Sequence, residues 1–289
     1  MIAEFQSQRP RLLAIAYRLL GSMADAEDIV QDAFVRWQRV DRTVIDSPAA
    51  WLTRVTTNLA LNLLDSAERR HREPAAALPE PVVTEGGPLG PLESVAARES
   101  ISFGVLVLME RLPSAERAVF VLHQAFGYSH REIAELLGST EEASRQRLRR
   151  ARGRLRDGDG RRSEPADPEH VRRLSESFLR AAQAGDMEQL HLVLSADVTS
   201  IADGGGAVGT ARFPIVGVDK VARYWAGLGR RPESVVVVFM PVELNGTPAL
   251  IVSMDGAPIA AVLFAVTDRI DSIWLIVDPE KLRRLPATA

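Results

Sequence analysis

Residues 129–154 read Ser-His-Arg-Glu-Ile-Ala-Glu-Leu-Leu-Gly-Ser-Thr-Glu-Glu-Ala-Ser-Arg-Gln-Arg-Leu-Arg-Arg-Ala-Arg-Gly-Arg, and they decide how the rest of the chain is interpreted. Ser129 and Glu132 have the spacing of a capping box, so a helix is predicted to begin there. Gly138 suits the left-handed backbone position that ends a helix. Two short helices joined by such a glycine turn are typical of a helix-turn-helix.

The second predicted helix is rich in arginine. Ser139 and Glu142 repeat the capping-box spacing, so this helix is expected to begin directly after the turn. Its apolar stripe is thin, and its other faces carry Arg145, Gln146, Arg147, Arg149, Arg150, Arg152 and Arg154. A helical hairpin with a solvated basic face would show the same charge. Because turn chemistry, spacing and charge agree here, we predict a DNA-binding helix that lies in the major groove.

The composition is that of a soluble globular protein of two or three domains. The chain has 289 residues and a net charge of -3, which does not by itself indicate a nucleic-acid partner. It has no cysteine, which excludes disulfides and Cys-ligated metals, and no cofactor is expected. We see neither a signal-peptide pattern nor an apolar run long enough to cross a membrane. The expected location is the cytoplasm.

Three helices are predicted ahead of the helix-turn-helix, over residues 5–20, 25–40 and 48–70. The second has an acidic face that carries Asp25, Asp28, Gln31 and Asp32. These carboxylates are either a solvated surface favoured by the helix dipole or a docking surface for a basic partner. The third carries Asn58 and Asn62 one turn apart, and it ends in a basic cluster that could lie along phosphates.

The remaining chain is expected to contain two linkers, more helices and a sheet. Prolines and glycines mark the linkers at residues 74–92 and 157–168, with helices over 94–111 and 113–126 between them. A helix is then expected over 168–184, followed by a second short helix that ends at Leu194. Another helix is expected over 218–228. The strand patterns cover 198–202, 235–242, 249–254, 259–266 and 273–277. Helices followed by an antiparallel sheet predict an α+β domain.

Three blocks resemble one protein family. They are Asp25-Ala-Glu-Asp-Ile-Val-Gln-Asp-Ala-Phe34, Trp51-Leu-Thr-Arg-Val-Thr-Thr-Asn-Leu-Ala60 and Leu112-Pro113 ahead of the helix-turn-helix. In this order and spacing they resemble the extracytoplasmic-function (ECF) sigma factors of bacterial RNA polymerase. The first two resemble sigma domain 2, and the third resembles sigma domain 4.

The rest of the chain resembles a SnoaL-like domain of the NTF2-like cone fold, and three short pieces resemble the SigJ-like group that carries it. These pieces are Leu78-Pro-Glu-Pro81, Asp203-Gly-Gly-Gly206 and Asp278-Pro-Glu-Lys-Leu282. Ala207 stands where the group usually has lysine, and Asp278 where it usually has asparagine. The resemblance implies a multidomain protein with two all-α sigma domains followed by an α+β domain. The implied boundaries are 1–73 for domain 2, 74–92 for a linker, 93–156 for domain 4, 157–167 for a second linker and 168–289 for the SnoaL-like domain.

The resemblance also implies partners and residue roles. The partners would be core RNA polymerase, through its beta-prime clamp and beta flap, and promoter DNA. Asp25, Asp28, Gln31 and Asp32 would contact the polymerase clamp. The minus-10 element would be met by Arg42, Asn58, Asn62, Arg69 and Arg70, and the minus-35 element by Arg145, Gln146, Arg149 and Arg150. Arginine can pair with guanine in the major groove and glutamine with adenine.

The SnoaL-like domain is interpreted as a built-in regulator that contacts domain 2 and the linker within the same chain. Its regulatory residues would be Leu78, Pro79, Glu80, Pro81, Asp203, Gly204, Gly205, Gly206, Asp278 and Lys281. A cone-shaped cavity could also admit a small ligand. The rival is a polyketide-cyclase or isomerase-type enzyme with Asp203 or His191 as the base, fused to a DNA-binding module. A two-component-type regulator leaves the first 75 residues unexplained.

Overall fold

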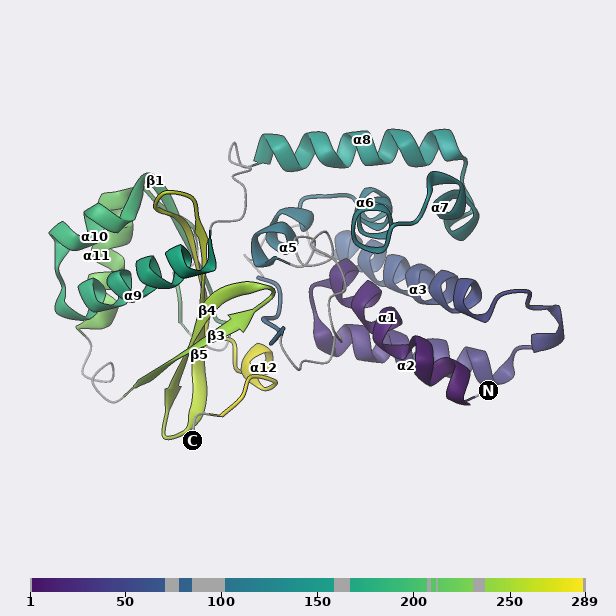
Figure 1. The fold of residues 1–289 in the computed structure, drawn as a ribbon, viewed down its shortest axis with the longest axis horizontal. Coiled ribbons are helices and arrows are strands. Elements are labelled where there is room, and N and C mark those ends of the chain that lie inside the picture. The colour runs from purple at the N-terminus through teal and green to yellow at the C-terminus, as the bar shows by residue number, and fades with distance from the viewer. Residues whose placement is uncertain are drawn as a thin grey trace. The chain divides into compact units, whose positions relative to one another are not determined.

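The structure is a computed structural model, and it describes residues 2–70, 78–84, 102–158, 167–206, 209–211, 213–230 and 237–287. Two compact units make up the chain (Figure 1). Unit 1 comprises residues 1–73 and 84–162, and unit 2 comprises residues 74–83 and 163–289. The short piece 74–83 therefore belongs to the C-terminal unit, although it is far from the rest of that unit in sequence.

Unit 1 begins with three helices that match the predicted ones closely. They are α1 (Ile2–Leu20), α2 (Met23–Arg39) and α3 (Pro48–Arg70), with the short 3₁₀ helix η1 (Arg42–Val44) between the last two. Gly21 has a φ of 69° and ends α1 as predicted. Ser22 caps α2 by accepting a hydrogen bond from Asp25 N at 3.2 Å. Buried apolar side chains from α1 and α2, with Leu52 and Leu59 of α3, make their common core.

The described part of unit 1 contains four more helices: α5 (Phe103–Met109), α6 (Ser114–Phe126), α7 (His130–Leu137) and α8 (Glu141–Gly158). The capping box of Ser129 and Glu132 is present at the start of α7. The predicted cap of α8 at Ser139 is wrong by one residue, since Thr140 Oγ1 accepts the bond from Ala143 N at 3.1 Å. Ser139 N still donates to Ala134 O, so this residue closes the preceding turn instead. Residues 94–101 of the predicted helix lie outside the described residues.

Within unit 1, helices α1 to α3 pack against helices α5 to α8. Arg117 of α6 donates to the carbonyl of Leu19 at the end of α1, at 2.8 Å. Arg54 of α3 donates to Glu135 O near the end of α7, at 3.0 Å. Arg11 lies over the Phe126 ring, with the guanidinium 5.5 Å from the ring centroid. Arginine donors thus satisfy carbonyls at helix ends that have no partner within their own helix.

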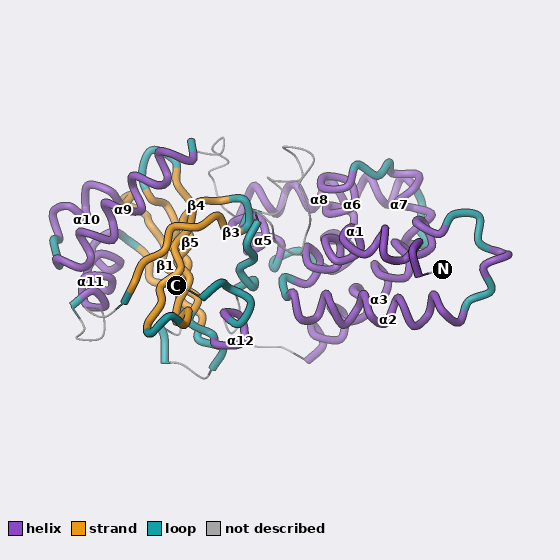
Figure 2. Tube along the Cα trace, turned by 60° about the horizontal axis from the view of Figure 1, so that its bottom comes forward, coloured by secondary structure: helices purple, strands orange, loops and turns teal. Residues whose placement is uncertain are grey.

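Unit 2 places three helices on one side of a curved sheet (Figures 1 and 2). The helices are α9 (Pro168–Ala184), α10 (Met187–Val193) and α11 (Val218–Gly229), and α12 (Pro279–Leu282) follows the sheet. The strands are β1 (Leu194–Asp203), β2 (Ile215–Val216), β3 (Val238–Leu244), β4 (Thr247–Met254), β5 (Ala257–Val266) and β6 (Ile270–Ile276). Phe178 and Trp225 form the centre of the core between helices and sheet. The predicted α+β class is confirmed.

The sheet order is β2-β1-β6-β5-β4-β3, and it corrects the sequence prediction in two ways. β1 pairs with β6 in parallel, whereas the sequence predicted an antiparallel sheet. This pairing joins strands that are distant in sequence, so no local pattern could reveal its direction. The two-residue strand β2 was not predicted, because Ile215 and Val216 are too short a run to show an alternating pattern.

Gly153 provides a direct test of how α8 is built. It lies inside the helix, where a Cβ atom would meet no other atom within 4 Å. Glycine costs about 1 kcal/mol relative to alanine in a helix interior. We therefore expect Gly153→Ala to raise the free energy of unfolding by about 0.5–1 kcal/mol, measured by urea unfolding followed at the helical circular dichroism signal.

Gly138→Ala is the matched control for this experiment. Gly138 has a φ of 59° and also has open space around it, so only backbone strain should change. Alanine in the left-handed region costs roughly 1–2 kcal/mol, so this variant should be less stable than the parent. A Gly153→Ala variant that is destabilised as well would contradict the helical assignment of this position.

Candidate functional site

An extended piece of the chain, residues 78–83, is anchored to unit 2, and we name it the anchored linker segment. It pairs with the turn after β3: Asn245 N donates to Val82 O at 2.9 Å, and Val82 N donates to Asn245 Oδ1 at 3.1 Å. Val83 forms an isolated antiparallel bridge with Leu244. Leu78 and Val82 are buried. Both main-chain hydrogen-bonding groups of Val82 are therefore taken up by one asparagine.

Asp203, the last residue of β1, is the centre of the second anchor. Its Oδ2 accepts from Leu78 N at 2.8 Å and from Lys281 Nζ at 2.6 Å, and its Oδ1 accepts from Gly205 N at 2.9 Å. Lys281 Nζ also donates to Leu78 O. The Asp203 side chain is 8% exposed and that of Lys281 is 21% exposed. The ion pair thus satisfies both main-chain groups of Leu78 in a site shielded from water.

Local sequence explains how this anchor is built. Gly205 has a φ of 59°, and a Cβ atom there would collide with the carboxylate of Asp278. Asp278 caps α12 by accepting a hydrogen bond from Glu280 N at 3.0 Å. The short helix that it starts carries Lys281 toward Asp203. A glycine is therefore required where the chain leaves β1, so that the two motifs can meet.

Glu80 adds a third contact. It is 3% exposed, and its Oε1 lies 3.0 Å from Arg284 NH1. The structure thus brings together Leu78, Glu80, Asp203, Gly205, Asp278 and Lys281 from the predicted regulatory set. Pro79, Pro81 and Gly204 are buried beside them, and Gly206 is exposed. Sequence reasoning missed Asn245 and Arg284; Asn245-Gly246 is a typical hairpin dipeptide, which could have drawn attention to the first.

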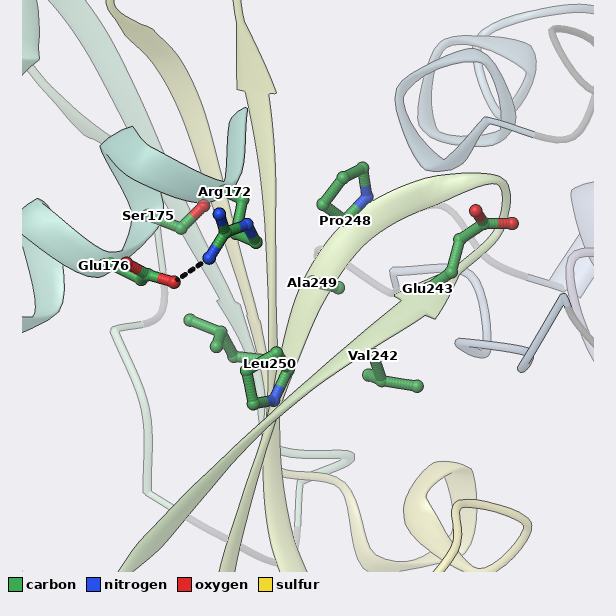
Figure 3. A pocket seen from close by; sticks show the side chains of 9 residues that line it. Arg172, Ser175, Glu176, Val242, Glu243, Pro248, Ala249 and Leu250 are labelled. Carbon is green, nitrogen blue, oxygen red and sulfur yellow. Dashed lines mark hydrogen bonds and ion pairs between the residues drawn. The ribbon is translucent and has the colours of Figure 1, made fainter. Parts of the chain in front are cut away.

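The enzyme candidates do not form an acid–base pair. Both carboxylate oxygens of Asp203 accept hydrogen bonds from within the protein, from Leu78, Lys281 and Gly205. His191 lies on α10, and its Nε2 is 3.3 Å from the exposed Asp219. A pocket of about 290 Å³ lies between α9 and strands β3 and β4, but neither Asp203 nor His191 lines it (Figure 3). Two of its charged lining residues, Arg172 and Glu176, pair with each other, and Glu243 is the third.

The helix-turn-helix distributes the arginines of α8 unequally. Arg145 pairs along its own helix with Glu141 and lies 3.9 Å from Glu142. Arg150 and Arg154 both approach Glu116 of α6. Arg152 donates to Gln124 at 2.8 Å. Arg149 and Gln146 are exposed, and within the described part of the chain Arg149 pairs with no carboxylate.

Two histidines lie where the helices of the helix-turn-helix meet. His123 and His130 stack with ring centroids 4.7 Å apart. His130 Nδ1 lies 2.9 Å from the hydroxyl of Ser144, which is buried on α8. Burial lowers the pKa of His130 below its ordinary value of 6.5, and the nearby His123 and Arg145 lower it further. A neutral His130 therefore suits this junction.

The predicted residues of the first three helices lie at the surface where they are described. Asp25, Asp28, Gln31 and Asp32 are exposed on α2, and Asn58 and Asn62 are exposed on α3. The side chains of Arg42, Arg69 and Arg70 lie outside the described residues. Of the helices that the structure describes, none is long and apolar enough to cross a membrane. No group of three potential metal ligands is found among the described residues.

Comparisons with known proteins agree with this architecture. Sigma-70 region 2 matches residues 5–70, and Sigma-70 region 4 matches residues 103–155. The ECF RNA polymerase sigma factor SigJ of Mycobacterium tuberculosis is 37% identical over 295 residues, which cover 99% of this chain and 94% of the relative. The probable sigma factor SigI of the same species is 31% identical over 292 residues, with 99% and 96% covered. The crystal structure of SigJ aligns with a TM-score of 0.77 at 34% identity over 100% of both chains.

The contact between Asp203 and the linker can be tested by hydrogen exchange. Replacing the carboxylate in Asp203→Ala removes the acceptor of the Leu78 amide and leaves Lys281 unpaired. Losing a buried hydrogen bond to a charged group costs about 1.5–3 kcal/mol. We expect peptides that contain Leu78 to exchange at least about tenfold faster, measured by mass spectrometry. Asp268→Asn, a change at an exposed carboxylate in the same unit, is the control; equal exchange in both variants would contradict the anchor.

The His130 contact predicts how the helix-turn-helix responds to pH. Its pKa is lowered in the folded protein, so the unfolded chain binds more protons as the pH falls below 6.5. The stability linked to this group is complete above that pH and is lost as the pH falls through the folded pKa. We expect His130→Gln to weaken the fall in melting temperature between about pH 7.5 and pH 5.5. His170→Gln, in α9, should leave that fall unchanged, and an unaltered fall in His130→Gln would exclude the effect.

Proposed function

Because the chain belongs to the extracytoplasmic-function sigma factors of bacterial RNA polymerase, we propose that its C-terminal unit regulates transcription initiation by holding the linker between the two promoter-binding modules. As a sigma factor the protein directs transcription initiation, and its partners are core RNA polymerase and promoter DNA. The observation that carries the proposal is the contact of Asp203 and Lys281 with both main-chain groups of Leu78. The functional boundaries that we propose are residues 1–73, 93–156 and 168–289 for the three domains.

The polymerase contact is assigned to the acidic face of α2. Asp25, Asp28 and Asp32 are exposed with Gln31, whereas Ala26, Ile29, Val30 and Ala33 on the other face are buried. One helix thus separates a packing face from a charged face that can meet a basic partner. We propose that this charged face binds the beta-prime clamp and that the second module binds near the beta flap. The protein would then act in the cytoplasm with the polymerase.

The minus-10 contact is assigned to η1 and the exposed side of α3. Val44 in η1 is 76% exposed, so an apolar side chain of this helix is accessible to a partner. Asn58 and Asn62 are exposed on α3, and Arg42, Arg69 and Arg70 extend this set in sequence. An amide and an apolar surface suit a base that leaves the stack as the strands separate.

The minus-35 contact is assigned to α8. Arg145, Gln146, Arg149 and Arg150 are exposed on this helix. Ser144 and Leu148 are buried against the rest of the module, so they fix which side of α8 remains free. Arginine and glutamine can each bind one base with two hydrogen bonds, worth about 1–3 kcal/mol of discrimination per base pair.

The anchor matters for function because, along the chain, one promoter-binding module precedes it and the other follows it. The anchored linker segment leaves residues 71–77 between it and α3, and residues 84–102 between it and α5. A chain spans at most about 3.5 Å per residue, so fixing part of the linker limits how far the modules can separate. The two promoter elements must be bound at the same time. A held linker therefore favours the state that is not engaged with a promoter.

Run-off transcription with purified core polymerase and a pooled promoter library tests this proposal. The full chain should give specific transcripts. Asp203→Ala and Lys281→Met release Leu78 without touching the DNA-binding helices, and each should raise the transcript yield by about three- to tenfold. Asp268→Asn in the same unit should leave the yield unchanged.

Two outcomes would contradict the proposal in different ways. Equal yields from the released variants and the parent would show that the anchor does not regulate initiation. No transcript and no binding to core polymerase from any of the four proteins would overturn the sigma role itself.

A further inference from the structure

Glu116 is a buried carboxylate that the proposed function does not use. It lies in the first turn of α6, with 6% of its surface exposed. Its Oε1 is 3.7 Å from Arg150 Nε, and its Oε2 is 3.1 Å from Arg154 Nε. These two arginines are one helical turn apart on α8 and therefore point to the same side. One carboxylate on α6 thus faces two cations of the DNA-binding helix.

The two contacts depend on charge more than on hydrogen-bond alignment. Glu116 Oε2 is buried and has no aligned hydrogen-bond donor within the described chain, although Arg154 Nε is close. The side chains of Arg150 and Arg154 remain 59% and 54% exposed, so a DNA phosphate could reach either guanidinium. A phosphate that did so would compete with Glu116 for the same cation.

The burial of the partner carboxylate decides which arginines stay paired when DNA is near. Taking one partner away from a buried charge is strongly unfavourable, because the remaining charge has lost its compensation. The Glu116 side chain is 8% exposed, so losing Arg150 and Arg154 to DNA would leave it as a buried charge without a partner. The pair between Arg145 and Glu141 is different, since both side chains are about half exposed, at 53% and 43%. Exposed pairs contribute little, so Arg145 can leave Glu141 for DNA at small cost.

We propose that Glu116 is a positioning residue that withholds Arg150 and Arg154 from DNA phosphates and leaves Arg145, Gln146 and Arg149 to meet the duplex. The inference rests on the proposed DNA-reading role of α8. Within that role, it assigns Arg150 to the pair with Glu116 and no longer to the residues that contact the bases of the minus-35 element. Phosphate contacts strengthen binding to every sequence alike. By drawing both cations toward one buried carboxylate, Glu116 lowers non-specific affinity and so increases the ratio of specific to non-specific binding.

The salt dependence of DNA binding tests this role with the full chain. Each phosphate contact adds about 0.9 to the slope of log affinity against log salt concentration. Glu116→Gln keeps the size of the side chain and removes its charge. We expect its slope on a labelled random-sequence duplex to be steeper than that of the parent by about 1–2, measured by fluorescence anisotropy over roughly 50–300 mM salt.

A general charge effect is separated from the specific one by two further proteins. Glu135→Gln makes the same charge change on α7, where Glu135 pairs with the exposed Arg131, and it should leave the slope nearly unchanged. Arg150→Gln with Arg154→Gln should restore the parental slope in the Glu116→Gln background. The same double change should alter the slope of the parent very little. A slope that is unchanged in Glu116→Gln, or lowered equally by the arginine changes in both backgrounds, would overturn the proposal.

A second measurement keeps the proposal testable if Glu116→Gln fails to fold. Arg154→Gln with Arg150→Gln leaves Glu116 buried without its two cations, so the melting temperature without DNA should fall. Arg147→Gln is the control, because no carboxylate pairs with Arg147 among the described residues. Equal melting temperatures for the double variant and this control would overturn the holding role. If neither the parent nor Asp203→Ala, in which the linker is released, binds a duplex at any salt concentration, the DNA-reading role of α8 fails, whereas binding with an unchanged slope removes only the role of Glu116.

Discussion

The ion pair of the buried Asp203 with the partly buried Lys281 is the contact that holds the linker to unit 2. It joins the end of β1, the short helix α12 and the linker residue Leu78, three places that are far apart in sequence. A buried ion pair is favourable only when the remaining hydrogen-bonding capacity is also satisfied. Gly205 N supplies a third donor to Asp203, and Leu78 O supplies a second acceptor to Lys281. The linker is therefore part of the environment that makes this pair stable.

The helices could be predicted closely from sequence, and the reason lies in their local signals. Pro48 and Pro168 each begin a helix whose predicted and observed limits agree, because a first-turn proline and a preceding cap act within a few residues. The strand pairs could not be predicted in this way. β1 and β6 lie side by side in parallel, although β2, α11, β3, β4 and β5 come between them along the chain. Such pairing is decided by the packing of the whole sheet against α9, α10 and α11.

The candidate sites likewise combine features that the sequence indicated with contacts that only the structure shows. The resemblance selected Leu78, Asp203 and Lys281, but nothing in the sequence indicated that Lys281 binds the carbonyl of Leu78 or that Asn245 binds Val82. On α8 the sequence showed a row of arginines that looked equivalent. The structure separates Arg150 and Arg154, which face a buried carboxylate, from Arg149, which does not. Charge patterns along a chain therefore indicate a DNA-binding helix, whereas the availability of each charge depends on the neighbouring helix.

An anchor of this kind suits regulation because its strength is moderate. A hydrogen bond to a charged group contributes about 1.5–3 kcal/mol, so the contacts of Leu78 and Glu80 together amount to several kcal/mol. Moving a two-state equilibrium from 1:99 to 99:1 requires a difference of about 5.5 kcal/mol, which is of similar size. Binding to polymerase and to a promoter can supply that difference if both need a released linker. A continuous apolar interface would be harder to open, whereas a few polar contacts centred on Asp203 can be exchanged for others as the linker moves.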